Sequence, residues 1–153
     1  MIDRAQFAPW ISDEAKALFL GYIQQPPAPV DLPGARAFYN EFNQRHLDVA
    51  LANYDVDIVD GEIGGVIAQT VTPAGGVTRD GVLLCLHGGG FMWGSGAGAL
   101  LEAVPVAATT GMKVIAVNYR LAPEHIYPTA VDDVMTVYEA ELGETGANRI
   151  GIY

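Results

Sequence analysis

Five consecutive residues, His87-Gly88-Gly89-Gly90-Phe91, form the pattern in this sequence with the most direct chemical meaning. They follow an apolar run from Val82 to Leu86, which is typical of a buried strand. Glycine has no Cβ, so a run of glycines adopts positive φ and approaches a ligand closely. At the carboxyl end of a parallel strand, successive N–H groups can converge on an anion. Acyl transfer needs such donors, because attack on an ester carbonyl places negative charge on its oxygen. The run therefore indicates either an anion-stabilising loop or a plain glycine-rich turn.

Other chemistries fit the sequence less well. A phosphate-binding loop would require the pattern GxxxxGK[ST], which is absent, and no lysine lies near the glycine run. The single cysteine, Cys85, excludes an internal disulfide and a four-cysteine zinc site, and its apolar surroundings indicate a buried, inert thiol. His46 and His125 have no companion ligands at metal-binding spacing. We therefore expect neither a metal nor an organic cofactor.

Composition limits the class of protein. The 153 residues suit one domain, and 50% of them are hydrophobic, which excludes a disordered acidic tail. Eight basic and 18 acidic residues give a formal net charge of −10, which would repel nucleic acid and anionic lipid surfaces. No apolar stretch is long enough for a membrane span, and Met1 to Gln6 lack the features of a secretory signal. These observations predict a cytoplasmic protein.

The first third of the sequence predicts two helices. Residues 12–25 begin with the N-cap Ser12 and show apolar residues at three- and four-residue spacing. Asp31 is the expected N-cap of a second helix, and Pro33 suits its first turn.

From Tyr54 onward the pattern changes to short strands and turns, followed by the continuous apolar runs 81–86 and 114–117. Such runs predict parallel strands that are covered on both faces. The connecting segment 97–110 is a predicted crossover helix, although Pro105 should kink or split it. A further helix is expected over 128–142 and another buried strand from Arg149, which together give an α/β fold with a mostly parallel sheet.

The glycine motif gains meaning from the segments that follow it. These are Asn118-Tyr119-Arg120-Leu121-Ala122-Pro123-Glu124, then Tyr127-Pro128, then Asp132-Asp133. The combination resembles the hormone-sensitive-lipase family of α/β hydrolases, and it does so well over 55–153 and loosely before that. The resemblance implies an α/β-hydrolase fold, with N-terminal cap helices in 1–52 and the first half of the hydrolase core in 53–153.

The resemblance also implies roles for the loop. Gly88 and Gly89 would give the N–H groups of an oxyanion hole, and Gly90 would permit the tight turn and is a candidate third donor. His87 would shape the loop through hydrogen bonds and would not be the general base. Phe91 and Trp93 would either line a substrate pocket or simply pack.

The remaining motif residues look structural by the same resemblance. Tyr119, Arg120 and Glu124 would fix the loop after the second parallel strand, with a buried interaction between the arginine and the glutamate. Asp132 and Asp133, near a helix start, are natural partners for N–H groups and for the helix dipole.

A serine hydrolase needs a nucleophile, a base and an acid, and the sequence lacks the G-x-S-x-G pattern that holds the serine in this fold. Ser95 lies between two glycines but follows the glycine loop rather than a strand, so we interpret it as a loop residue. The family would place its serine just after the strand that starts at Arg149, and its acid and histidine further on. We therefore expect an N-terminal portion of a longer esterase, with a complementary C-terminal segment as its partner.

The resulting expectation is a carboxylic ester hydrolase that acts on small acyl esters through a serine acyl-enzyme, inactive without the C-terminal segment. The alternatives are a non-catalytic ligand-binding member of the same fold and an inactive truncated fragment. An intact G-x-S-x-G with a downstream aspartate and histidine would favour catalysis. Association into a homo-oligomer stays open.

Overall fold

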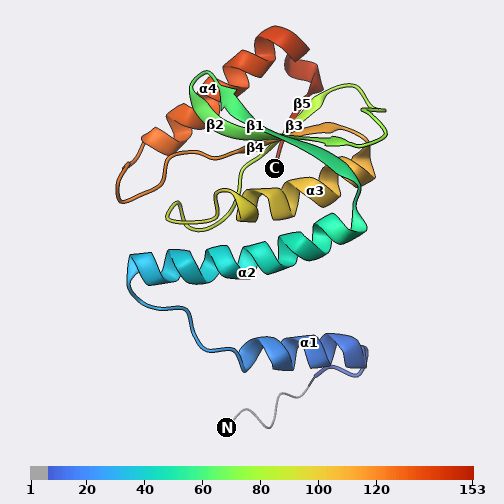
Figure 1. The fold of residues 1–153 in the computed structure, drawn as a ribbon, viewed down its shortest axis with the longest axis vertical. Helices are drawn as coiled ribbons and strands as arrows, with labels where there is room; N and C mark the ends of the chain where they lie inside the picture. Colours follow the sequence, from blue (N-terminus) through green and yellow to red (C-terminus); the bar gives the residue numbers. More distant parts are fainter. Residues whose placement is uncertain (1–6) are drawn as a thin grey trace.

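A computed structural model describes residues 7–153 of the chain (Figure 1). In chain order, its elements are α1 (Asp13–Ile23), α2 (Leu32–Asn53), β1 (Val56–Ile63), β2 (Val66–Pro73), β3 (Val82–Cys85), α3 (Ala97–Thr110), β4 (Lys113–Val117), α4 (Thr129–Thr145), the 3-10 helix η1 (Ala147–Arg149) and β5 (Ile150–Ile152). Strand, helix, strand, helix, strand from β3 onward is the predicted α/β pattern.

The five strands form one sheet in the order β1-β2-β4-β3-β5. β1 pairs with β2, and β2 with β4, in antiparallel orientation. β3 pairs in parallel with β4 on one side and with β5 on the other. The carboxyl ends of these three parallel strands therefore lie along the same edge of the sheet, and β3 is the middle strand of the three.

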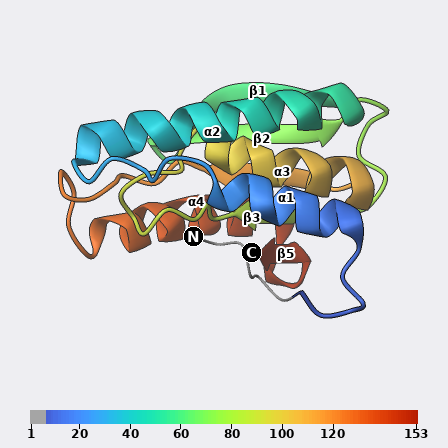
Figure 2. The ribbon, with the colours of Figure 1, turned by 90° about the horizontal axis from the view of Figure 1, so that it is seen from below.

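Helices cover both faces of the sheet (Figure 1). On one face α3 packs against the strands and α2 lies along α3, as Figures 1 and 2 show, while α4 covers the other face. α1 lies beyond α2 and buries none of its residues. The mixed sheet with helices on both faces confirms the predicted fold class.

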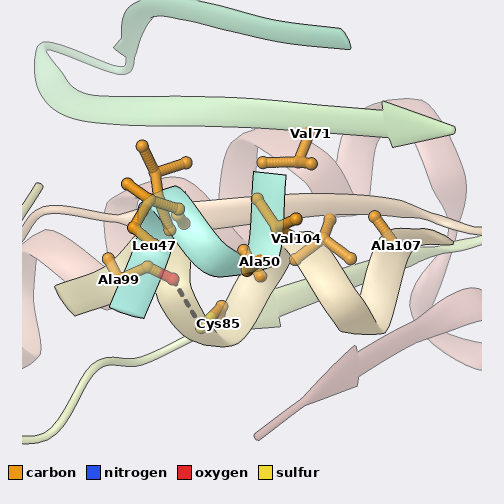
Figure 3. Packing of buried hydrophobic residues seen from close by; sticks show 11 residues of the cluster. Leu47, Ala50, Val71, Cys85, Ala99, Val104 and Ala107 are labelled. Carbon is orange, nitrogen blue, oxygen red and sulfur yellow. Dashed lines mark hydrogen bonds between the residues drawn. The ribbon is translucent and has the colours of Figure 1, made fainter. Parts of the chain in front are cut away.

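The core beneath α3 consists of small and branched apolar side chains (Figure 3). Val104 and Ala107 of α3 meet Val71 of β2 and Leu47 of α2 there. Cys85 is fully buried in this cluster, with its Sγ 3.8 Å from the Ala99 carbonyl oxygen. The predicted burial is confirmed, and it raises the pKa of the Cys85 thiol to about 11, which disfavours the reactive thiolate.

Local sequence signals explain most helix limits. Ser12 and Asp31 accept hydrogen bonds from the N–H groups of Ala15 and Gly34, as N-caps do. Of the two effects expected of Pro105, a kink or a split, the split is wrong, because α3 is continuous from Ala97 to Thr110.

The last long helix, α4, begins one residue later and ends three residues later than predicted. It includes Gly143 and stops at Gly146, whose φ of 84° lies in the region that favours glycine.

The structure bears on the predictions about a secretory signal and a membrane span only within the described residues. The absence of a secretory signal was predicted from Met1 to Gln6, which lie outside them. Within residues 7–153, no helix combines the length and apolar character that crossing a membrane would require. The division into cap helices (1–52) and core (53–153) stays a prediction.

Candidate active site

The glycine motif forms an exposed loop where β3 ends. The end of β5 lies beside the start of this loop. The N–H of Leu86 donates to the Tyr153 carbonyl oxygen at 2.8 Å, and the N–H of Tyr153 donates to the Leu84 carbonyl oxygen at 3.0 Å. The loop therefore starts at the edge of the sheet where the parallel strands end. Ligand sites of open α/β sheets lie at this edge.

The N–H groups of Gly88, Gly89 and Gly90 have no hydrogen-bond acceptor among residues 7–153. The first and third of these glycines are exposed and Gly89 is half-buried. Gly88 and Gly89 line a hollow of about 240 Å³, together with side chains that include Trp93 and Tyr39. Backbone donors that are free and face a hollow can stabilise an anion.

Close contacts within the loop require glycine at two positions. Gly89 has a φ of 121°, and a Cβ there would overlap the carbonyl oxygen of Trp93. Gly94 has a φ of 107°, and a Cβ there would overlap the carbonyl oxygen of Gly88. The loop thus folds back on itself, and the backbone of residues 88–89 packs directly against that of residues 93–94.

Phe91, at the tip of this loop, has a φ of 63° and is the one non-glycine residue with positive φ in the described part of the chain. A bulky side chain in this conformation costs about 1–2 kcal/mol, so other contacts must hold it. One such contact is the hydrogen bond that the N–H of Ala122 donates to the carbonyl oxygen of Phe91 at 2.8 Å.

His87 is buried where the loop begins. Its ring stacks on Tyr119, with centroids 4.2 Å apart, and its Nδ1 lies 2.8 Å from the Gly88 carbonyl oxygen. Since a carbonyl oxygen only accepts, Nδ1 carries the hydrogen, and Nε2 is left buried without a partner. Burial lowers the pKa of His87, which favours the neutral ring. A buried side chain that bonds the loop itself suits the loop-shaping role.

Residues after β4 hold the loop at both ends. The Tyr119 hydroxyl donates to the carbonyl oxygen of His87. The Asn118 Oδ1 accepts from the N–H of Gly96 at 2.6 Å, and its Nδ2 donates to Gln69 of β2. The Asn118 contact had not been predicted, although the residue lies within the motif.

The expected pair between Arg120 and Glu124 is wrong. Arg120 instead binds Asp133 of α4, which accepts from the backbone N–H, Nε and a terminal nitrogen of Arg120 at 2.6–3.1 Å. Asp133 is buried, whereas the Arg120 side chain is 54% exposed, so the pair is buried on one side only. Asp132 is exposed in the first turn of α4, and its carboxylate accepts no hydrogen bond from the described residues.

Glu124 binds Arg36 of α2, which lies 88 residues away in the sequence. Both carboxylate oxygens of Glu124 accept from the guanidinium at 2.7 Å. Arg36 also donates to the carbonyl oxygens of Met92 and Ala122, so this arginine joins α2 to both loops of the motif.

Phe91 and Trp93 lie at different hollows. Trp93 stacks on Tyr39 of α2, with centroids 4.8 Å apart and an interplanar angle of 12°. Phe91 is 60% exposed and lines a separate, mainly apolar hollow of about 330 Å³ with residues that include Met92, Tyr127 and Pro128.

Sequence reasoning missed the contribution of α2 to the site. Arg36, Tyr39, Asn43, Leu47 and Ala50 recur at three- and four-residue spacing, which places them on one face of α2. This face meets the loop and α3, where the Asn43 amide lies so close to Gly98 that a Cβ there would be 2.8 Å from it. The spacing was available in the sequence, but three of these residues are polar and do not suggest a buried face.

The first prediction compares two neighbouring glycines. Gly89→Ala should lower the free energy of unfolding by about 1–3 kcal/mol, because the new Cβ meets backbone and φ is positive. Gly88→Ala should change it by less than about 0.5 kcal/mol, because nothing lies within 4 Å of a Cβ there. Urea unfolding followed by circular dichroism measures both values. Equal losses would contradict this geometry of the loop.

The second prediction concerns acid. Hydrogen bonds from Arg120 hold the pKa of Asp133 below its ordinary value of 3.8, despite burial. The stability that this carboxylate contributes is therefore present above that value and lost as the pH falls through the lower, folded value. Asp133→Asn should lower the free energy of unfolding at pH 7 by roughly 1–3 kcal/mol and should weaken its decline between pH 5 and pH 3. Asp132→Asn is the matched control, and an identical pH profile for both variants would refute the assignment.

The chain is similar to known α/β hydrolases and esterases. Residues 83–151 match the family described as the alpha/beta hydrolase fold. An esterase of Acinetobacter venetianus is 36% identical over 90 residues, which are 59% of this chain and 29% of the relative. An ethyl acetate hydrolase of Pseudomonas putida is 45% identical over 75 residues, which are 46% of this chain and 24% of the relative.

Solved structures show the same similarity over more of the chain. The crystal structure of esterase E25 superposes with a TM-score of 0.69 at 27% identity, covering 97% of this chain and 51% of that one. An esterase of the bacterial hormone-sensitive lipase family gives a TM-score of 0.71 at 25% identity, covering 92% and 45%. The chain thus spans less than a third of these curated relatives and about half of the solved chains. It has the α/β-hydrolase fold and is similar, over part of their length, to esterases that include one of the bacterial hormone-sensitive lipase family.

Proposed function

We propose that this chain forms part of a carboxylic ester hydrolase and supplies the oxyanion hole from the N–H groups of Gly88 and Gly89. One observation carries the proposal: these donors have no acceptor among the described residues, although the loop around them is tightly bonded. Gly90 is a candidate third donor, since its N–H is also free. The relatives named esterase and ethyl acetate hydrolase support a small acyl ester as substrate.

The chemistry follows from charge. When a nucleophile attacks an ester carbonyl, the carbonyl oxygen gains negative charge that the ground state does not have. Two backbone donors fixed by the folded loop stabilise that charge without rearranging, and each contributes about 3 kcal/mol to lowering the barrier. The loop therefore stabilises the transition state more than the bound substrate.

We further propose that a C-terminal segment supplies the serine nucleophile, the acid and the histidine base. The sequence contains no G-x-S-x-G, and β5 is an edge strand whose Ile152 is 53% exposed. In the parallel register, Leu84 is opposite Ile152, so a strand that continued past Tyr153 would pass the start of the glycine loop. A nucleophile at that point would face the free N–H groups.

Residues of this chain are poor substitutes for that triad. His87 is buried, and its Nδ1 hydrogen bonds the Gly88 carbonyl oxygen, so its ring cannot turn toward a substrate. Ser95 lies in a loop and has no hydrogen bond to a histidine among the described residues. Phe91, exposed beside an apolar hollow, is better placed to contact a substrate than Trp93, which stacks on Tyr39.

Reconstitution tests the proposal. The chain should not hydrolyse p-nitrophenyl acetate by itself, but should do so when it is coexpressed with the C-terminal half of a related esterase that carries G-x-S-x-G, aspartate and histidine. The control is the same C-terminal half with its serine replaced by alanine. Activity is followed by the release of p-nitrophenol.

Two results would count against the proposal. Hydrolysis by the chain alone would overturn the division of roles. A stable complex that binds the ester without turnover would favour a ligand-binding function.

A further inference from the structure

Arg36 uses its whole guanidinium group to join segments that are distant in sequence. From α2, its Nε donates to the Met92 carbonyl oxygen at 2.8 Å and one terminal nitrogen donates to the Ala122 carbonyl oxygen at 2.9 Å. The two terminal nitrogens also bind the two carboxylate oxygens of Glu124 at 2.7 Å. The side chain of Arg36 is 28% exposed and that of Glu124 is 53% exposed, so solvent reaches the pair mainly from the glutamate side.

These bonds meet at the strained residue of the loop. Phe91 has positive φ, its carbonyl oxygen accepts from the N–H of Ala122, and the carbonyl oxygen of Ala122 accepts from Arg36. Met92 follows Phe91 in the chain, and its carbonyl oxygen also accepts a hydrogen bond from Arg36. Two consecutive carbonyl groups at the tip of the loop are thus fixed, one directly by Arg36 and one through Ala122.

The fixed tip is connected to the proposed donors by a single turn. The Gly89 carbonyl oxygen accepts from the N–H groups of Met92 and Trp93 at 3.0 and 3.3 Å. A peptide plane is rigid, so the orientation of the Gly89 carbonyl group fixes that of the Gly90 N–H, which lies in the same plane. Phe91 and Met92 are exposed, so little core packing holds this turn in place.

We propose that Arg36 is a positioning residue of this site: it fixes the strained tip of loop 87–94 against loop 118–128, and thereby the peptide plane that carries the Gly90 N–H, the candidate third donor. For its catalytic consequence, the inference rests on the proposed function. The planar fork of arginine suits three acceptors in different directions, which the single ammonium group of lysine cannot match.

Hydrogen exchange of the 153-residue chain, followed by NMR, tests the positioning role directly. Arg36→Gln should speed exchange at the Ala122, Met92 and Trp93 amides by roughly tenfold, with little change in the core strand β4, because local opening becomes easier. Arg36→Lys should have a smaller effect of the same kind. Arg45→Gln, at an exposed position of α2, is the matched control and should change none of these rates.

Unchanged exchange at these three amides in Arg36→Gln would overturn the proposal. So would faster exchange throughout the sheet, because Arg36 would then support the fold as a whole. If Arg36→Gln does not fold, the same criteria apply to Arg36→Lys.

The reconstituted esterase gives a second readout. Arg36→Gln should lower kcat about tenfold or more with KM little changed, and Arg36→Lys should restore part of the loss. A rise in KM at constant kcat would contradict a role in positioning the oxyanion donors. If reconstitution gives no activity even with Arg36 intact, the proposed function fails, while the exchange experiment still decides the positioning role.

Discussion

Backbone N–H groups left without acceptors at the end of a buried strand are the feature on which the rest of this structure depends. Free donors at a surface are easily lost, because a flexible loop turns them toward its own carbonyl groups or toward water. In this chain the contacts of the loop keep these donors from its own carbonyl groups. Gly89 and Gly94 allow the two halves of the loop to lie in backbone contact. Hydrogen bonds from Tyr119 to His87 and between Asn118 and Gly96 fix its two ends.

The architecture supports this loop from three directions. The loop begins at the end of β3, which is paired with β4 on one side and β5 on the other, so the start of the loop is held in place. The segment after β4 bonds it from one side, and α4 holds that segment in turn through Asp133. α2 contacts the loop through Arg36 and Tyr39, so this helix is connected to the site as well as to the core.

The sequence predicted what depends on local signals. Ser12 and Asp31 marked the starts of two helices, and the continuous apolar runs marked β3 and β4, because caps and strand patterns are set by neighbouring residues. The position of the glycine motif after β3 followed from the same pattern. The helix predicted over 97–110 is α3, and Pro105 lies inside it without interrupting it.

Long-range pairs could not be predicted in this way. The family resemblance implied a pair between Arg120 and Glu124, but the side chains of both residues bind other partners, Asp133 and Arg36. Nothing in the local sequence connects Arg36 with Glu124 across 88 positions, and only the folded arrangement of α2 against the loop brings them together. The roles of the loop residues stay predictions until activity is measured.

The most direct measurement removes one N–H donor without changing any side chain. Glycolic acid placed at position 88 by nonsense suppression replaces the Gly88 N–H with an ester oxygen and leaves the side chain and shape of the loop unchanged. In the reconstituted esterase, this change should lower kcat for p-nitrophenyl acetate by roughly 10²–10³-fold with KM nearly constant. An unchanged kcat, in a protein that still folds and assembles, would show that the Gly88 amide does not stabilise the oxyanion and would contradict the account.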